Sequence, residues 1–265
     1  MRARLAERLR ALGHEPSQAH ALQGGDLSEV WALAEVVVKT GETVATEGRM
    51  LAALGAAGAP VPAVHHVEPG LLILERLQPD RPTPAHWQAF GTALAQLHAH
   101  PADSYGWEED HAFGPVALVN APLPAQPGLW PAFWAERRLL PLAGTLPADR
   151  ARRVERLAAT LPDRLPADPG GLIHGDLWQG NLVFTAGRAM LIDPAVIRGH
   201  GEVDLGMLTL FGQPPEAFVQ GYGPLAPGWR ERRPVYQLHP ALVHLALFGT
   251  AYAGLVDRLL DACGA

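Results

Sequence analysis

Cysteine and lysine are nearly absent from this chain of 265 residues. Cys263 is its single cysteine, which excludes an intrachain disulfide and is typical of a reducing compartment such as the cytoplasm. Of the 21 basic residues, 20 are Arg and one, Lys39, is Lys. Lys39 follows the β-branched run Val36-Val37-Val38. A strand that ends in any solvated base could use Arg, so the exception predicts a site that needs a compact ammonium group instead of a wide guanidinium fork.

Long apolar runs and a strong positive charge are also missing. No stretch of about 18 consecutive apolar residues occurs, which argues against a membrane-spanning helix. Met1-Arg2-Ala3-Arg4 is not followed by an apolar segment, so we expect no signal peptide. The net charge of −6 disfavours broad binding to nucleic acid. With 48% apolar and 18% charged residues, the composition is that of a globular protein. We expect a cytoplasmic protein without membrane or nucleic-acid partners.

Local patterns divide the chain into a β-rich first region, residues 1–78, and a mainly helical second region, residues 79–265. In the first region they predict a helix over 2–12, strands near 30–33 and 36–40, a helix over 42–54 and a buried strand at 71–74. In the second they predict helices over 83–98, 133–142, 149–161, 204–211 and 235–263, short strands near 172–173, 182–184 and 189–192, and a loop-rich stretch over 106–131. Pro240 is expected to break or bend the last helix.

The densest cluster of chemically useful side chains lies in the second region. Residues 174–181 read H-G-D-L-W-Q-G-N, and the next apolar run ends in L-I-D-P at 191–194. These segments supply the carboxylate of Asp176, the amide of Asn181 and the carboxylate of Asp193. Protein kinases use such a set to orient the acceptor hydroxyl and to hold magnesium beneath the phosphates of ATP. An Asp-x4-Asn pair alone is common by chance, so the assignment depends on what precedes it.

The residues upstream occur in the order that a protein-kinase-like fold requires. Gly24-Gly25 lies in a turn, Lys39 ends a strand, Glu47 comes early on the next helix, and the buried strand at 71–74 leads into a connecting segment. In this interpretation Lys39 contacts the phosphates of ATP and Glu47 holds it in place. A Walker A loop is excluded, because Val36-Val37-Val38 stands where that loop needs glycine.

Together these side chains predict phosphoryl transfer to a hydroxyl. The transition state is loose, so positioning and charge neutralisation provide most of the catalysis. Asp176 is expected to orient the acceptor hydroxyl and to take its proton late, since an alcohol is too weak an acid to ionise at neutral pH. Asn181 and Asp193 offer the hard oxygen ligands that Mg²⁺ prefers. His174 is interpreted as a residue that orients the loop, not as a base.

Nearly the whole chain resembles the fructosamine kinases, also called ketosamine-3-kinases, of the protein-kinase-like superfamily that includes the aminoglycoside phosphotransferases. The most specific motif is the segment 174–181, in which Trp178 distinguishes this family from the aminoglycoside enzymes. Further matching segments are Gly106-Trp107, Phe113-Gly114, Asn120, 130–139, 193–196, 199–205, 231–234, His244 and 247–249. The resemblance implies an α+β fold of two lobes: a small, β-rich N-terminal lobe and a larger, mainly helical C-terminal lobe.

The resemblance also implies an activity, the ATP-dependent phosphorylation of the 3-hydroxyl of a ketosamine, which is the rearranged adduct of a sugar and an amine. The 3-phosphate is then lost spontaneously and the amine is freed, so the reaction repairs glycated amines or proteins. By motif position, Asp176 is the catalytic base and Asn181 and Asp193 bind Mg²⁺. Trp178 packs against the sugar-amine.

The residues that would bind ATP follow from the same resemblance. The resemblance implies that Lys39 and Glu47 serve the phosphates of ATP and that the backbone of Glu75 and Leu77 holds adenine. The turn at Gly24 and Gly25 corresponds to the glycine-rich loop of the family. Three further aromatic residues at helical spacing are interpreted as core: Trp130, Phe133 and Trp134.

The sequence departs from the family pattern at several positions. Asp26 stands where many members have a cysteine, so we expect a monomer or a dimer without a linking disulfide. Gln179 replaces the usual serine and Ile197-Arg198 an aromatic residue, which shifts the expected substrate preference. Two alternatives stay open. One is a phosphotransferase for an aminoglycoside or another alcohol, for which Trp178 and the segment 130–139 would be incidental. The other is a nucleotide-binding protein without catalysis.

Overall fold

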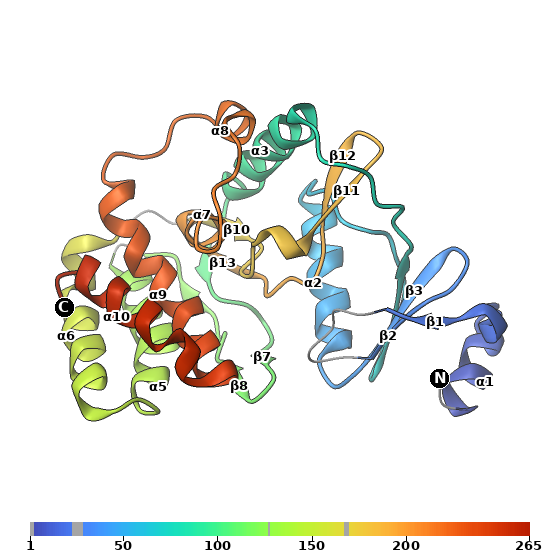
Figure 1. The fold of residues 1–265 in the computed structure, drawn as a ribbon, viewed down its shortest axis with the longest axis horizontal. Helices are drawn as coiled ribbons and strands as arrows, with labels where there is room; N and C mark the ends of the chain where they lie inside the picture. The colour runs from blue at the N-terminus through green and yellow to red at the C-terminus, as the bar shows by residue number, and fades with distance from the viewer. Residues whose placement is uncertain (1–2, 23–28, 127, 167–169) are drawn as a thin grey trace.

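The structure is a computed structural model that describes residues 3–22, 29–126, 128–166 and 170–265. It shows an elongated molecule in two parts, a β-sheet flanked by helices at the N-terminal end and a larger, mainly helical part at the C-terminal end (Figure 1). Strand β5 (Leu71–Glu75) closes the first part, and helix α3 (Pro84–His98) opens the second. The boundary predicted after residue 78 falls in the connection between them.

The N-terminal sheet consists of antiparallel strands in the order β1-β2-β3-β5-β4. Their bounds are β1 His20–Ala21, β2 Glu29–Ala32, β3 Val36–Thr40 and β4 Val64–Glu68. Helix α1 (Ala3–Ala11) packs on one face of this sheet and helix α2 (Val44–Ala56) on the other.

Alternation along strand β5 explains its continuous apolar run, because successive side chains of a strand point to opposite faces. Leu71 and Ile73 pack with Leu9 of helix α1, whereas Leu72 and Leu74 pack with residues of helix α2. Both faces of the strand are therefore covered, and each position along it has to be apolar.

The same alternation places the single lysine. In strand β3, Val36 and Val38 belong to the apolar cluster on the α1 side. Lys39 follows Val38 and projects to the opposite face, where helix α2 lies. It stands in register with Leu72, which packs on that same face.

The C-terminal part is built around one large apolar core. Trp130, Phe133 and Trp134, with 0–1% of their surfaces exposed, lie in that core as predicted. The core continues into the N-terminal part through Met50 and Leu54 of α2. The remaining helices are α4 Leu129–Trp134, a π-helical segment Ala135–Leu139, α5 Leu140–Ala143, α6 Ala148–Arg164, α7 Glu202–Leu208, α8 Glu216–Tyr222, α9 Trp229–Phe248 and α10 Ala253–Ala262.

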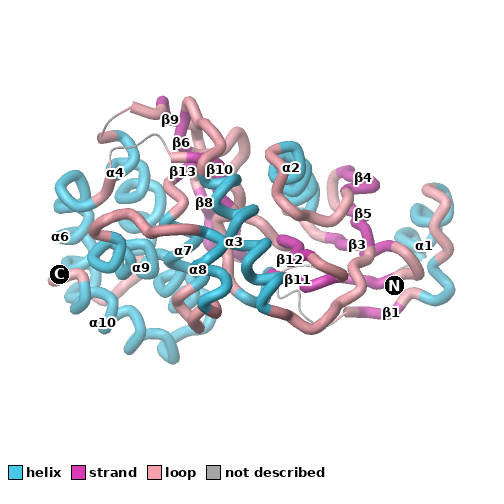
Figure 2. The backbone as a smooth tube through the Cα atoms, turned by 90° about the horizontal axis from the view of Figure 1, so that it is seen from above, coloured by secondary structure: helices cyan, strands magenta, loops and turns pink. Residues whose placement is uncertain are grey.

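Among its described residues, the C-terminal part has four pairs of short antiparallel strands, and two of these pairs border the H-G-D-L-W-Q-G-N segment. The hairpin β11–β12 lies between the two parts of the molecule in both views (Figures 1 and 2). Its backbone contacts the N-terminal half of the chain, since the Leu191 amide donates to the carbonyl oxygen of Pro60. The pairs are β10 Gly171–Ile173 with β13 Ile197–Gly199, β11 Leu182–Thr185 with β12 Arg188–Leu191, β6 Ser104–Tyr105 with β9 Leu123–Pro124, and β7 His111–Phe113 with β8 Val116–Leu118.

Of the two outcomes predicted at Pro240, a break or a bend, the break does not occur. Helix α9 runs through Pro240 because its neighbours Leu238, Ala241 and Leu242 are buried in the core and hold the backbone helical. The interruption comes at Gly249, whose φ of +76° ends α9 before a 3₁₀ turn and α10. The sequence patterns also missed β4, whose residues V-H-H-V-E alternate poorly, and the strands within the stretch 106–131.

One helical stretch of the described chain, Trp229–Ala262, is long and apolar enough to cross a membrane by length and composition, with a mean hydropathy of 1.3 over its most apolar window. A single such stretch is weak evidence for a membrane span, because core helices of soluble proteins pass the same test. Only 28% of that window is buried. The C-terminal helices therefore leave an apolar face at the surface.

Candidate active site

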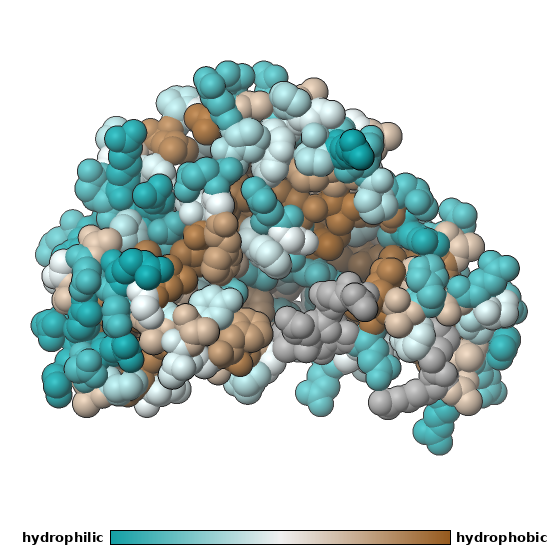
Figure 3. Space-filling view, in the orientation of Figure 1, coloured by the Kyte–Doolittle hydropathy of each residue, from teal (hydrophilic) through white to brown (hydrophobic). Residues whose placement is uncertain are grey.

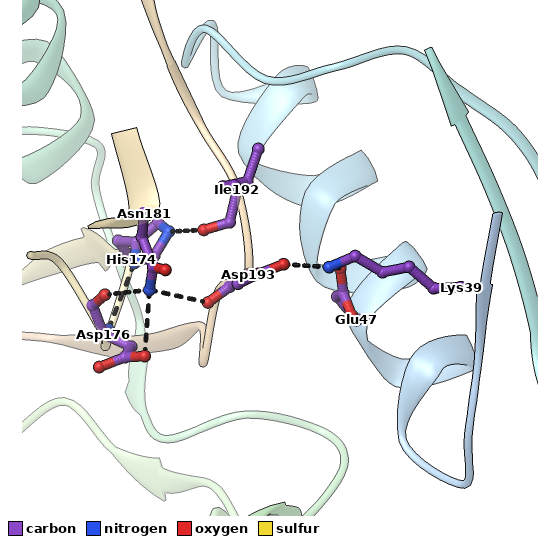
Figure 4. Close-up of polar contacts among 7 residues, drawn as sticks. All are labelled: Lys39, Glu47, His174, Asp176, Asn181, Ile192 and Asp193. Carbon is purple, nitrogen blue, oxygen red and sulfur yellow. Dashed lines mark hydrogen bonds and ion pairs between the residues drawn. The ribbon is translucent and has the colours of Figure 1, made fainter. Parts of the chain in front are cut away.

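The single lysine and its predicted partner form a buried ion pair. The Lys39 ammonium donates to Glu47 Oε1 at 2.6 Å, and 8% of each residue's surface is exposed (Figure 4). Burial alone would lower the pKa of Lys39, but the carboxylates of Glu47 and Asp193 raise it above its ordinary value. The ammonium is therefore charged at neutral pH. A rigid, dry, positive charge of this kind suits a phosphate group.

Asp193 reaches the same ammonium from the C-terminal part of the chain. Its carboxylate accepts a hydrogen bond from Lys39, so the strand lysine and the residue after β12 meet across the two parts of the molecule (Figure 4). Asp193 has a φ of +53°, and no other non-glycine residue in the described ranges has a positive φ. A strained backbone of this kind persists only where its surroundings enforce it, and such positions cluster at functional sites.

The loop that carries Asp176 is held by a fully buried carboxylate. The backbone amides of His174 and Gly175 both donate to Asp204 at the N-terminal end of α7, each at 2.8 Å. Asp204 also contacts His98 Nε2 at 3.1 Å, and this hydrogen bond helps to lower its pKa although burial alone would raise it. The Asp204 carboxylate, which solvent does not reach, therefore holds the loop in place through two backbone hydrogen bonds.

His174 orients the same loop from within. Its Nε2 lies 2.9 Å from the carbonyl oxygen of Ile192, and its Nδ1 accepts a hydrogen bond from the Asp176 amide (Figure 4). These contacts fix the tautomer with the proton on Nε2. Burial lowers the pKa of His174, so the ring is neutral. The side chain is 0% exposed and cannot exchange protons with a substrate, in agreement with the orienting role predicted for it.

Asp176 and Asn181 lie side by side. The Asn181 Nδ2 donates to Asp176 Oδ2 at 3.1 Å and to the backbone oxygen of Asp176 at 2.8 Å, and it lies 3.5 Å from the backbone oxygen of Asp193. Because Nδ2 makes these bonds, the carbonyl oxygen Oδ1 is left for a cation. Burial raises the pKa of Asp176 to about 7, which keeps its carboxylate able to accept a proton near neutral pH.

Asp176 opens onto a cavity of about 350 Å³ in the C-terminal part. The cavity is mostly apolar. Beside Asp176 its wall is formed by the residues Phe113, Gly175, Trp178, Val203, Met207, Tyr236, His239, Pro240, Val243, His244, Leu247 and Phe248.

Trp178 lines this cavity and is 41% exposed. Its ring folds back over Gly180, where an added Cβ would lie 2.3 Å from the ring atoms. Gly180 therefore makes room for the orientation of Trp178, and the spacing W-Q-G within the motif has a steric reason.

The remaining predicted residues are placed as follows. Glu75 is the last residue of β5, and Leu77 lies in the connection to α3, where a nucleotide hinge is expected. Gln179 is exposed beside Trp178. Gly24, Gly25 and Asp26 lie outside the described residues.

A clamp between the two parts was not foreseen from the sequence. Glu109, in the loop before β7, accepts hydrogen bonds from Thr46 and Arg49 on helix α2. Asn120 donates to the backbone oxygen of Glu109, and the buried Arg138 donates to the Asn120 side chain at 2.6 Å. The helix that carries Glu47 is thus tied to the core of the C-terminal part.

Comparison with known proteins identifies the family. The sequence pattern of the family described as "Fructosamine kinase" matches residues 3–264. The chain belongs to the fructosamine kinase family. A "Probable ketoamine kinase" of Thermus thermophilus is 37% identical, over 91% of this chain and 92% of the relative. Another of that name, from Synechocystis, is 38% identical over 77% of this chain and 72% of the relative. The family resemblance stated from the motifs is confirmed, and the protein is a phosphotransferase of the kinase type.

Solved structures agree with the fold. A crystal structure from Thermobifida fusca named "putative fructosamine-3-kinase" superimposes with a TM-score of 0.86 at 33% identity, over 98% of both chains. An ADP-bound aminoglycoside phosphotransferase gives a TM-score of 0.63 at 16% identity, over 99% of this chain and 98% of the other. The latter likeness shows the fold alone. The predicted α+β, two-lobed, protein-kinase-like fold is confirmed.

Proposed function

We propose that this protein is an ATP-dependent kinase that phosphorylates the 3-hydroxyl of ketosamines. The observation that carries the proposal is the position of Asp176. Its carboxyl group faces the apolar cavity on one side and Asn181 on the other, while Asp193 links that group to the Lys39–Glu47 pair. An acceptor hydroxyl in the cavity and a nucleotide under Lys39 would therefore meet at Asp176. The family membership supports the same substrates.

In the proposed reaction the 3-oxygen of the ketosamine forms a bond to the γ-phosphorus, and the bond to the β–γ bridging oxygen breaks, so ADP leaves. Asp176 orients the hydroxyl and receives its proton as the new bond forms. Lys39 places its positive charge on the α- and β-phosphates, which belong to the departing ADP. Glu47 keeps the ammonium in that position, because the pair is buried and has little freedom.

The residues present fit a magnesium ion bound with ATP. Asn181 Oδ1 and the Asp193 carboxylate are hard oxygen donors, and Mg²⁺ completes its shell with phosphates and waters. Among the described residues no group of three or more His, Cys, Asp and Glu side chains could hold a metal. The ion would therefore depend on the nucleotide for part of its coordination. When bound it would neutralise charge on the β- and γ-phosphates.

The predicted fate of the product is spontaneous loss of the 3-phosphate, which frees the amine, so the proposed role is repair of glycated amines or proteins. We propose that the protein works in the cytoplasm as a monomer or a dimer without a disulfide link. Cys263 is 4% exposed, and burial raises the pKa of its thiol to about 11, so a linking disulfide is disfavoured.

The cavity disfavours the aminoglycoside alternative. An aminoglycoside carries several positive charges and needs several carboxylates to bind it. Among the described residues of the cavity wall, Asp176 is the only acid. The non-catalytic alternative is disfavoured as well, because Lys39, Glu47, Asp176, Asn181 and Asp193 are present and lie next to one another.

The test is an assay of ADP formation with magnesium, ATP and a panel of acceptors. The panel contains fructose- and ribulose-derived ketosamines, with an aminoglycoside and choline as controls. We expect ketosamine-dependent ADP formation and none above background with the controls. Turnover of an aminoglycoside or choline without turnover of any ketosamine would contradict the proposal.

A further inference from the structure

We propose that the site selects ketosamines whose amine carries an uncharged, apolar substituent, with an aromatic ring as the best fit. The residues that would bind this substituent are Phe211, His244, Phe248 and Tyr252, which we call the amine-substituent subsite. The proposal rests on the ketosamine kinase activity proposed above and specifies the acceptor of that same site.

The aromatic side chains of the subsite form a continuous row that begins at the cavity. Trp178 meets Phe211 edge-on with 6.5 Å between ring centroids, and Phe211 lies 5.0 Å from His244. His244 in turn lies 5.5 Å from Phe248 and 5.0 Å from Tyr252. The row thus leads from the residue beside Asp176 to the end of helix α9 and the turn beyond it.

Two side chains of the aromatic row are exposed and can be reached by a ligand. Phe211 is 47% exposed and Phe248 is 50% exposed, although large aromatic side chains are usually buried when nothing binds to them. Phe248 and His244 also line the cavity itself. Figure 3 shows that hydrophobic surface gathers around the hollow between the two parts of the molecule. Because His244 and Phe248 line the cavity and Phe211 contacts His244, the exposed rings are continuous with the cavity and are not a separate surface patch.

The covalent structure of a ketosamine directs its substituent to this row. The amine nitrogen is three bonds from C3, hence about 4 Å away. When the 3-hydroxyl is at Asp176, the nitrogen and the start of its substituent must lie inside the cavity. The ammonium can face the Trp178 ring, which favours a cation over its face. The substituent then leaves along α9, past His244 and Phe248.

The charge of the amine substituent decides whether the cavity can accept it. Among the described residues of the cavity wall there is no Arg or Lys, and the only acidic side chain is that of Asp176. A carboxylate on the substituent would lose water, find no cationic partner and be repelled by Asp176. A ring would instead gain contacts with the row of aromatic side chains.

The experiment compares three fructosamines with the same sugar, made from benzylamine, methylamine and glycine. The measured quantity is kcat/KM. We expect the benzylamine adduct to exceed the methylamine adduct about ten-fold and the glycine adduct to be lowest.

In Phe248→Ser the benzyl-to-methyl ratio of kcat/KM should fall about five-fold, mainly through KM. The matched control is Val219→Ser, which changes an apolar residue on α8 that is 45% exposed against 50% for Phe248, and should leave the ratio unchanged. Equal values for the benzyl and methyl adducts, or the same ratio in Phe248→Ser, would overturn the proposal.

Binding measurements separate this inference from the proposed function. The 3-deoxy analogues of the benzyl and methyl adducts cannot be phosphorylated, and their binding is followed by tryptophan fluorescence. Tighter binding of the benzyl analogue, lost in Phe248→Ser, supports the subsite. Absence of turnover with every ketosamine refutes the proposed function, whereas turnover with equal binding of both analogues refutes only the subsite. A dimer that dissociates in Phe248→Ser without any change in the ratio would assign the row to a subunit interface and would also refute it.

Discussion

On the proposed phosphate side of the site, Lys39 and Glu47 are buried and already paired with each other and with Asp193. On the proposed acceptor side, Trp178, Phe211 and Phe248 each expose two fifths or more of their surfaces. The first side is polar and assembled before any ligand arrives, as electrostatic stabilisation requires. The second is apolar and open, as a surface that recognises different amines requires. Changes on the phosphate side should therefore reduce the rate with every acceptor, whereas changes on the acceptor side should change which acceptor is used.

The largest effect is expected at Asp176, where the two sides meet. Asp176→Asn keeps the size and shape of the side chain and retains an oxygen that can accept the hydrogen bond from Asn181. It removes the carboxylate that would accept the proton. We expect kcat to fall about 10³-fold with every ketosamine while ATP binding is nearly unchanged. Single-turnover kinetics and ATP titration measure the two quantities. Activity close to wild type would show that Asp176 is not the base.

A smaller loss is expected from Lys39→Arg on the phosphate side. The charge is retained, but the planar guanidinium cannot occupy the tight space between Glu47 and Asp193. We expect kcat/KM for ATP to fall about 10²-fold and the relative preference among ketosamines to stay constant. Steady-state kinetics with two different ketosamines provide the check. A changed preference would mean that the two sides are not independent.

Gly180→Ala tests the acceptor side. Its Cβ would lie 2.3 Å from the Trp178 ring and must displace it. We expect the KM for a ketosamine to rise about ten-fold while the KM for ATP stays the same. Gly144→Ala is the matched control, because the nearest atom to its new Cβ is 3.9 Å away. If the KM for ATP rises as much as that for the ketosamine, the substitution has distorted the whole loop and Trp178 is not its specific target.

The smallest effect is expected at the clamp. Glu109→Gln weakens the contacts with Thr46 and Arg49 that tie α2 to the C-terminal part. Because the pair is solvent-exposed, we expect a change within about five-fold in the KM for ATP. Glu108→Gln is the control, since Glu108 pairs with Arg198 inside the C-terminal part. An equal change in both variants would show that the effect is general and does not pass through α2.

The contrast between the two sides of the site also explains which of its side chains could be predicted from the sequence. Lys39 and Glu47 were predictable because strand alternation and the first turn of the next helix fix where each side chain points. That Trp178, Asp176 and Asn181 lie close together was predictable because they share one short motif, and their roles in binding and catalysis stay predictions. The subsite could not be predicted in this way, since Phe211, His244 and Phe248 come together only when α9 packs beside α7. The family matches at His244 and 247–249 carried no indication of a role, and Phe211 belongs to no matching segment.

Other failures have local physical causes. The break expected as one outcome at Pro240 did not occur, because burial of Ala241 and Leu242 outweighs the lost backbone hydrogen bond. The alternative, a bend at Pro240, stays a prediction. Asp204 lies in the matching segment 199–205, but nothing in the sequence indicated that it and His98 hold the loop that carries Asp176, since both are many positions away from the motif and belong to different helices. The predicted glycine turn at Gly24 and Gly25 stays a prediction.

The proposed reaction is phosphorylation of the 3-hydroxyl of a ketosamine at this site. The most direct test follows the reaction of a fructosamine with magnesium and ATP by ³¹P NMR, together with an assay of free amine. The account predicts a transient sugar 3-phosphate signal, followed by inorganic phosphate and free amine in equal amounts. A stable phosphate ester at another hydroxyl, or ADP formation without release of amine, would contradict it.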